Sequence, residues 1–299
     1  MFKAFLALLM TSVLHGNAME PARFTPKASW ERQPILSVET IPQKTENGEN
    51  NIEISAASAI VIDLNSSKVL VRKNETERRQ IASLTKLMTG LIIAEEETPY
   101  TVIQISRNAA GTEGSSIFLN ADEKITIKDL VYGMMIASGN DAAMALAEYN
   151  GGTVANFVRK MNDHAKKLGL QNTHYSNPMG FDHEQNYSTA EDMALLSLYV
   201  LQNDFLTTPA NLEKYEAESR SGIPHEYVTT NELLNKTLGV PGITVHGLKT
   251  GTTPEAGQTL IAVATDANDH KIMTVVLGSS DRFQDTRNLI EWVYTNYRW

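Results

Sequence analysis

The sequence predicts an α+β fold of the α/β-sandwich kind, in which both ends of the chain build one antiparallel sheet and a helical subdomain is inserted between them. Two observations predict it. Apolar, β-branched runs bounded by turn residues occur near residue 60 and again after residue 244, whereas apolar residues recur at helical spacing in between. Strands, then helices, then strands are typical of an α+β domain.

The expected strands lie at the two ends of this region. The first two form a hairpin through the turn Asn65-Ser66-Ser67, whose residues favour turn geometry. The last two are joined by the polar turn 266–270 and precede a final helix over 285–297. The expected strands cover residues 57–63, 68–71, 244–250, 258–265 and 271–277.

Helices are expected where apolar residues recur every three or four positions. Two of their starts have the spacing of a capping box, Thr126 to Asp129 and Ser188 to Glu191. Gly169 is expected to cap a helix end. The expected helices cover residues 81–96, 130–137, 141–149, 157–168 and 193–201, which places the helical subdomain at roughly 84–200.

The first 18 residues have the features of a secretory signal peptide. Lys3 supplies the positive start, residues 4–14 are mostly apolar, and small residues precede the expected cleavage point after Ala18. The apolar run is short for a membrane span, although a retained N-terminal anchor is the alternative. We therefore expect cleavage, export to the periplasm or an equivalent extracytoplasmic space, and no integral membrane span in the mature chain.

Two segments are expected after the signal peptide. Residues 19–50 are polar and rich in Pro, Glu, Asn and Lys, which is typical of a flexible leader. Residues 51–299 are expected to form one domain, and about 250 residues are enough to build a core without disulfides.

Composition excludes several classes of protein and site. The net charge is −9, from 26 Lys and Arg against 35 Asp and Glu, whereas a nucleic-acid-binding protein usually carries a basic patch. The chain has no cysteine, and the pair His183-Glu184 lacks the second histidine that a zinc-protease motif needs. We therefore expect no nucleic-acid partner, no metal site and no cofactor.

The pattern Ser83-Leu84-Thr85-Lys86 is the main candidate for catalysis. Residues three apart on a helix face the same side, so the Lys86 amine can reach the Ser83 hydroxyl. Serine is a weak nucleophile until a base lies against it, and lysine is a base only when burial or a nearby cation lowers its pKa. Alone, the pattern equally fits a helix start with a surface lysine.

Two further motifs complete the set. Ser138-Gly139-Asn140 lies between two expected helices, where Gly139 permits a tight backbone; the alternative is a simple turn with Asn140 as helix cap. Lys249-Thr250-Gly251 follows an expected edge strand, and a cation, a hydroxyl and a residue without a side chain suit one wall of a cleft for a peptide carboxylate. Each motif occurs once, and the combination is far more specific than any member.

With these motifs, the chain resembles the low-molecular-mass penicillin-binding proteins, the serine D-Ala-D-Ala carboxypeptidases, over roughly residues 57–293. The resemblance implies a β-lactamase/transpeptidase-like fold, peptidoglycan stem peptides as substrates and β-lactam antibiotics as covalent inhibitors. It also rests on segments outside the three motifs, which are Gly114 to Ile117, Ala137 to Ala142, Ser188 to Ala194 and Gly247 to Gly257.

The resemblance also implies the chemistry of the catalytic residues. Ser83 is acylated by the penultimate D-Ala, Lys86 takes its proton, and Ser138 relays a proton to the leaving D-Ala. The backbone N–H groups of Ser83 and Thr252 form the oxyanion hole, which a tetrahedral intermediate needs.

Substrate binding is implied for Asn140, which bonds the substrate amide, and for Lys249 and Thr250, which hold the terminal carboxylate. The chain also departs from the family. Larger members carry a C-terminal β-rich domain and an amphipathic anchor, whereas this sequence stops at Trp299. Some members have a basic residue where this chain has Thr230, so carboxylate binding is expected to rest on Lys249 and Thr250.

Several functions remain open from the sequence. Hydrolysis by a carboxypeptidase is favoured over cleavage of cross-links by an endopeptidase. A β-lactamase is disfavoured because Glu232 lies only 17 residues before Lys249 and lacks the spacing of a deacylating glutamate. The third alternative is a sensor that captures penicillins or peptides without turnover.

Overall fold

A computed structural model describes residues 41–46, 52–236 and 238–299. The expected signal peptide and most of the expected leader lie outside the described residues. Within the leader, β1 (Gln43–Lys44) pairs with β13 (Tyr297–Arg298). Pairing with the rest of the chain therefore begins earlier than Ile52, where the sequence suggested that order starts.

A five-stranded antiparallel sheet forms the centre of the domain, in the order β10-β11-β12-β2-β3. The β12–β2 pair joins the two ends of the sequence, with Ile272 opposite Asp63. This confirms the sheet predicted from both chain ends. The strands are β2 (Ser58–Asp63), β3 (Val69–Lys73), β10 (Thr244–Thr253), β11 (Gly257–Thr265) and β12 (Lys271–Ser279).

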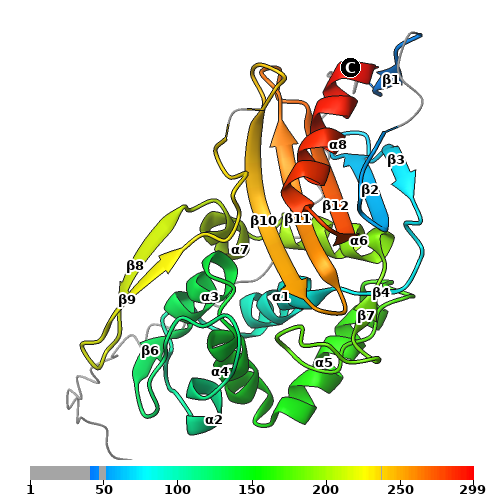
Figure 1. The fold of residues 1–299 in the computed structure, drawn as a ribbon. Helices are drawn as coiled ribbons and strands as arrows, with labels where there is room; N and C mark the ends of the chain where they lie inside the picture. Colours follow the sequence, from blue (N-terminus) through cyan, green and yellow to red (C-terminus); the bar gives the residue numbers. More distant parts are fainter. Residues whose placement is uncertain (1–40, 47–51, 237) are drawn as a thin grey trace, which may run out of the picture. The chain divides into compact units, whose positions relative to one another are not determined.

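Both faces of this sheet are covered by helices (Figure 1). On one face α8 (Arg282–Asn296) packs against β11 and β12, and on the other α6 (Ala190–Val200) packs against β12 and β2. Strand residues accordingly alternate between two apolar cores: Val61 packs with the α8 side, while Ile60 and Ile62 pack with the helical subdomain. This alternation is the period of two that a strand imposes.

The helical subdomain fills the chain between β3 and β10. Two short antiparallel strand pairs, β4 with β7 and β5 with β6, join its loops. It extends past the expected end through α7 to a hairpin, β8 with β9, that was not predicted. Besides α6, its helices are α1 (Lys86–Glu96), α2 (Arg107–Ala110), α3 (Ile127–Ile136), α4 (Asn140–Gly151), α5 (Val154–Lys167) and α7 (Asp204–Ala210), and its strands are β4 (Arg79–Gln80), β5 (Val102–Gln104), β6 (Lys124–Thr126), β7 (Tyr187–Ser188), β8 (Lys214–Glu218) and β9 (Pro224–Val228).

The predicted helix caps have mixed outcomes. Thr126 caps α3 by accepting the N–H of Asp129, and Gly169 follows α5 with a φ of 79°, as predicted. The cap of α6 is Thr189, which accepts the N–H of Asp192 at 3.0 Å, and not Ser188. Ser188 is wrong as a cap because it belongs to β7.

Candidate active site

Ser83 lies in a 3₁₀ turn, η1 (Ala82–Thr85), in front of α1, so the single helix predicted over 81–96 is wrong at its start. Ala82 has a φ of 49°, a conformation that residues with a side chain rarely adopt. Gly180 packs against this turn so closely that a Cβ there would lie 1.9 Å from the Ala82 carbonyl oxygen. The turn therefore depends on a glycine contact from another segment.

Lys86 is the first residue of α1 and is fully buried. Its Nζ lies 2.9 Å from Ser83 Oγ and donates to Asn140 Oδ1 at 2.7 Å and to the carbonyl of Met179 at 2.7 Å. Burial, and next the cation of Lys249, hold the Lys86 pKa well below its usual value, while Asp141 opposes them. The structure thus places a lysine that favours its neutral form against the serine hydroxyl.

Asn140 is held from three directions. Its Oδ1 accepts from Lys86, its Nδ2 donates to the Glu113 carbonyl at 2.8 Å, and its backbone N–H donates to the Ser115 carbonyl at 2.7 Å. Gly114 makes this approach possible, because a Cβ there would lie 2.6 Å from Asn140 Nδ2. Asn140 is therefore a fixed link between Lys86 and the loop over 113–119.

Ser138 is buried in the connection between α3 and α4 and has a φ of 60°. The left-handed residue of this motif is thus Ser138, whereas Gly139 matters for space: its Cβ would lie 2.9 Å from Asp141 Oδ1. The helix cap is Gly139, not Asn140. Within the described residues the Ser138 hydroxyl makes no hydrogen bond to another residue, which leaves it available to a ligand.

The motif Lys249-Thr250-Gly251 lies inside β10, and Gly251 is a strand residue rather than a turn residue. Lys249 Nζ donates to the Thr250 carbonyl at 3.0 Å, and the Thr250 and Thr230 hydroxyl oxygens lie 2.6 Å apart. A Cβ on Gly251 would lie 2.9 Å from the backbone nitrogen of Ser83. The missing side chain therefore lets the sheet edge approach the turn that carries Ser83.

Arg282 is a cation that the sequence analysis missed. It begins α8, which starts three residues earlier than predicted, after the cap Asp281. Its Nη1 donates to the Gly251 carbonyl at 2.8 Å and also to the hydroxyl of Thr252. Burial and this guanidinium lower the Lys249 pKa to about 7. The Asp281 cap signal would have placed the helix start, but no sequence pattern connects Arg282 to β10.

Hydrogen bonds or close packing join Ser83, Lys86 and Asn140 with Gly251. Lys249 and Thr250 occupy the adjoining strand, beside Thr252 and Arg282. Ser138 lies two positions before Asn140, in the connection that leads into α4. All eight predicted site residues thus belong to η1, α1, the α3–α4 connection, the start of α4 or β10, which are Ser83, Lys86, Ser138, Asn140, Lys249, Thr250, Gly251 and Thr252.

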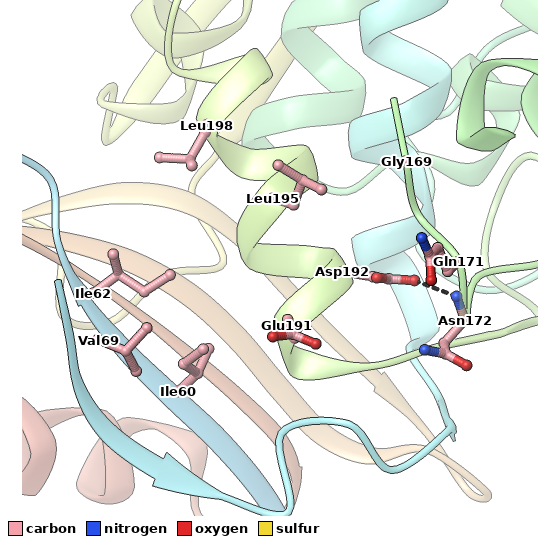
Figure 2. A pocket seen from close by; sticks show the side chains of 10 residues that line it. All are labelled: Ile60, Ile62, Val69, Gly169, Gln171, Asn172, Glu191, Asp192, Leu195 and Leu198. Carbon is pink, nitrogen blue, oxygen red and sulfur yellow. Dashed lines mark hydrogen bonds between the residues drawn. The ribbon is translucent and has the colours of Figure 1, made fainter. Parts of the chain in front are cut away.

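Two other features of the described residues bear on cofactors and ligands. They contain no cluster of metal-ligating side chains, and no helix among them is long and apolar enough to cross a membrane. A cavity of about 410 Å³ lies between the β2–β3 edge and α6 (Figure 2). The one buried carboxylate that lines this cavity, Asp192, already accepts the Asn172 N–H at 2.7 Å. This carboxylate therefore stabilises the neighbouring loop.

The antiparallel sheet, the inserted helical subdomain and the buried Ser–Lys pair define a class, the transpeptidase-like serine enzymes. Comparison with known sequences makes this specific. Residues 43–281 match the peptidase S11 family, described as D-alanyl-D-alanine carboxypeptidase, and the chain belongs to this family. This confirms the family that the three motifs indicated.

Individual relatives agree with this assignment. The D-alanyl-D-alanine carboxypeptidase DacF of Bacillus subtilis is 36% identical over 84% of this chain and 66% of its own length. The D-alanyl-D-alanine endopeptidase of Pseudomonas aeruginosa is 33% identical over 81% of this chain and 78% of its own length. The crystal structure of the Streptomyces K15 DD-transpeptidase has a TM-score of 0.76 at 27% identity, covering 83% of this chain and 100% of that one. The chain spans slightly less than two thirds of the length of DacF.

Proposed function

We propose that the chain is a serine D-Ala-D-Ala carboxypeptidase that trims peptidoglycan stem peptides through an acyl-enzyme. The observation that carries this proposal is the contact of the buried Lys86 amine with the Ser83 hydroxyl, in a chain of the peptidase S11 family. A neutral amine 2.9 Å from a hydroxyl is the arrangement that activates a serine nucleophile.

Acylation begins when Ser83 passes its proton to Lys86 and its oxygen attacks the carbonyl of the penultimate D-Ala. The negative charge that develops on the carbonyl oxygen is stabilised by the backbone N–H groups of Ser83 and Thr252. The close approach of Gly251 to the Ser83 nitrogen supports this pairing. The free hydroxyl of Ser138 relays a proton to the leaving amine, and water then releases the shortened peptide.

Binding of the substrate is assigned to the strand wall and to Asn140. The terminal carboxylate is held by Thr250 and by the cations of Lys249 and Arg282. The added cation of Arg282 should bind the carboxylate more strongly than Lys249 and Thr250 would without it. The amide group of Asn140 bonds the substrate's peptide amide. β-Lactam antibiotics, which carry a carboxylate and a reactive amide, would acylate Ser83 by the same contacts.

Release of D-Ala from purified pentapeptide tests the proposal directly. We expect release by the wild-type protein and covalent labelling by a fluorescent penicillin. Ser83→Ala should abolish both while keeping the thermal unfolding temperature. Labelling that persists in Ser83→Ala would show that the nucleophile is another residue. Rapid hydrolysis of the penicilloyl adduct would indicate a β-lactamase, and labelling without any peptide turnover would indicate a sensor.

An endopeptidase is the second candidate, because one relative bears that name. It would cut the cross-link between two stem peptides, a substrate with a bulky group on the scissile D-residue. Incubation with monomeric pentapeptide and with cross-linked dimers separates the two activities. Cleavage of dimers with intact pentapeptide would replace the carboxypeptidase assignment.

We also propose that the protein acts outside the cytoplasm after cleavage of residues 1–18. The support is the signal-peptide pattern of the sequence, together with a cell-wall substrate. N-terminal sequencing of the mature protein should begin near Met19, and fractionation should recover it from the extracytoplasmic space. Recovery mainly in detergent-extracted membranes, with an intact N-terminus, would show that the segment is retained as an anchor.

A further inference from the structure

Phe118 combines two unfavourable properties. Its side chain is 82% exposed, more than any other large apolar side chain in the described part of the chain. Its φ is 61°, which is strained for a bulky residue. Its neighbours Ile117 and Leu119 are buried in the core, whereas Phe118 itself does not pack there. An exposed aromatic in a strained conformation is a reason to look for a function.

The backbone around Phe118 is held rigidly by Asp141. The N–H groups of Ile117 and Leu119 both donate to this buried carboxylate at 3.1 Å. Ser116 donates its hydroxyl to Asp141 Oδ2 at 2.6 Å and accepts the Phe118 N–H at 2.8 Å. The strain is therefore imposed by contacts on both sides of Phe118, and the ring is directed to solvent before any ligand arrives.

The hairpin β8–β9 adds a second anchor to this loop. His225 on β9 donates from Nδ1 to the Ile117 carbonyl at 3.0 Å, and its Nε2 lies 2.6 Å from Glu123 Oε1. Both His225 and Glu123 are buried. Phe118 is thus exposed on a segment that is fixed to two different parts of the subdomain.

The loop that carries Phe118 is bonded to the proposed active site. Asn140, the residue before Asp141, donates from its backbone to Ser115 and from its side chain to Glu113. The loop runs between α2 and β6 (Figure 1). If Asn140 bonds the amide on the acyl side of the substrate, the groups that precede this amide extend past Asn140, toward the loop over 113–119.

We propose that Phe118 determines specificity by forming an apolar rim for the residue that precedes D-Ala-D-Ala. The ring packs against the long aliphatic side chain of a diamino acid in the stem peptide. This inference rests on the proposed function. A ring that is already fixed in place loses little conformational freedom on binding, which makes its contact more effective. The proposed preference is for a long aliphatic chain over a residue without one.

The test compares two peptides that differ only at this position. Release of D-Ala is measured from diacetyl-L-Lys-D-Ala-D-Ala and from acetyl-Gly-D-Ala-D-Ala. We expect Phe118→Ala to lower the ratio of kcat/KM for the lysyl over the glycyl peptide about tenfold, as is usual for loss of an apolar contact. Phe118→Leu should restore part of the ratio. Tyr100→Ala is the matched control, because Tyr100 is 77% exposed but lies outside this loop, and it should leave the ratio unchanged.

A second measurement separates this inference from the proposed function. Acylation of Ser83 is timed with a penicillin that bears a long aliphatic side chain and with 6-aminopenicillanic acid, which has none. Phe118→Ala should lower the ratio of these two acylation rates whether or not the wild-type protein releases D-Ala. A wild-type protein that releases no D-Ala would refute the carboxypeptidase proposal but not the role of Phe118. Equal losses on both members of each pair, or unchanged ratios, would overturn the role of Phe118.

Discussion

The proposed active site is formed on one side by β10, the strand wall, and on the other by η1, the α3–α4 connection and the loop over 113–119, the loop wall, and these two walls reach their geometry by different means. The wall formed by β10 is ordinary extended backbone, in which Lys249 to Thr252 follow the register of an antiparallel pair with β11. The opposite wall contains three residues with a positive φ and a side chain: Ala82 at 49°, Ser138 at 60° and Phe118 at 61°. Such conformations persist only where surrounding contacts impose them.

The contrast shows where the site depends on distant residues. On the strand wall, position follows from sheet pairing. On the loop wall, the strained backbone is held by Gly180 at one turn and by Asp141 at the other. The two walls meet where Gly251 faces the nitrogen of Ser83. Substitutions on the two walls should therefore have different consequences.

The largest contrast is expected between the two lysines. Lys86→Ala should slow acylation by a fluorescent penicillin by roughly 100 to 10,000-fold, because it removes the proposed general base. Lys249→Ala should be milder and should mainly raise the KM for peptide, because its proposed role is to hold the carboxylate. Acylation of Lys86→Ala at the wild-type rate would mean that the base is elsewhere.

Alanine at the two close-packed glycines should separate stability from catalysis. In Gly180→Ala, the new alanine must adopt a φ of 95° and its Cβ must displace a backbone carbonyl. We therefore expect the free energy of unfolding to fall by about 3–5 kcal/mol, with a clear drop in Tm. Gly251→Ala meets the hydroxyl of Thr259, a movable side chain, as its nearest atom, so its Tm should fall less. Its acylation rate should fall more than its stability explains, because the added Cβ crowds the Ser83 nitrogen. Equal Tm losses in both variants would contradict this.

The strand wall should also carry the pH dependence on the alkaline side. Lys249 has a pKa of about 7, so it loses its charge as the pH rises through that value. The kcat/KM for peptide should therefore decline above about pH 7, because one of the cations proposed to hold the carboxylate is lost. Lys249→Arg keeps its charge and should lose this decline. A profile with the same alkaline limb in Lys249→Arg would assign the limb to another group.

The smallest expected effect is a gain in stability at Phe118. Glycine adopts a φ of 61° without strain, and the exposed ring contributes little to the core. Phe118→Gly should therefore raise Tm by about 2–4 °C, which corresponds to roughly 1 kcal/mol for a domain of this size. Phe118→Ala keeps the Cβ and is the control, with little or no gain. A lower Tm for Phe118→Gly would show that the ring stabilises the free protein.

The sequence predicted the regular elements of the central sheet well, since they depend on local patterns. Apolar, β-branched runs bounded by turn residues located all five strands of the central sheet. The three motifs located the residues of both walls. The 3₁₀ turn at Ser83 was missed because positions three apart fall on one side in both kinds of helix, and only the contact with Gly180 distinguishes them.

Other features were missed because they arise only in three dimensions. Arg282 reaches Thr252 from the start of α8, although the two residues are 30 positions apart in the sequence. The hairpin β8–β9 consists of the segments Lys214–Glu218 and Pro224–Val228, whose charged and proline residues give a weak strand signal. The roles of Ser138 and Gly139 were exchanged because a glycine suggests backbone freedom, whereas here it supplies space.

The pairing of β2 with β12 has a consequence for how the protein folds. The partners Asp63 and Ile272 are separated by roughly 200 residues, and every strand on the β10 side of β2 is made late in synthesis. The sheet cannot close until nearly the whole chain is available, and such non-local topologies fold slowly. A growing chain therefore holds β2 and β3 as an incomplete pair without a cover. For the export proposed above, this delay would keep the polypeptide in the extended form that passage through a secretion channel requires.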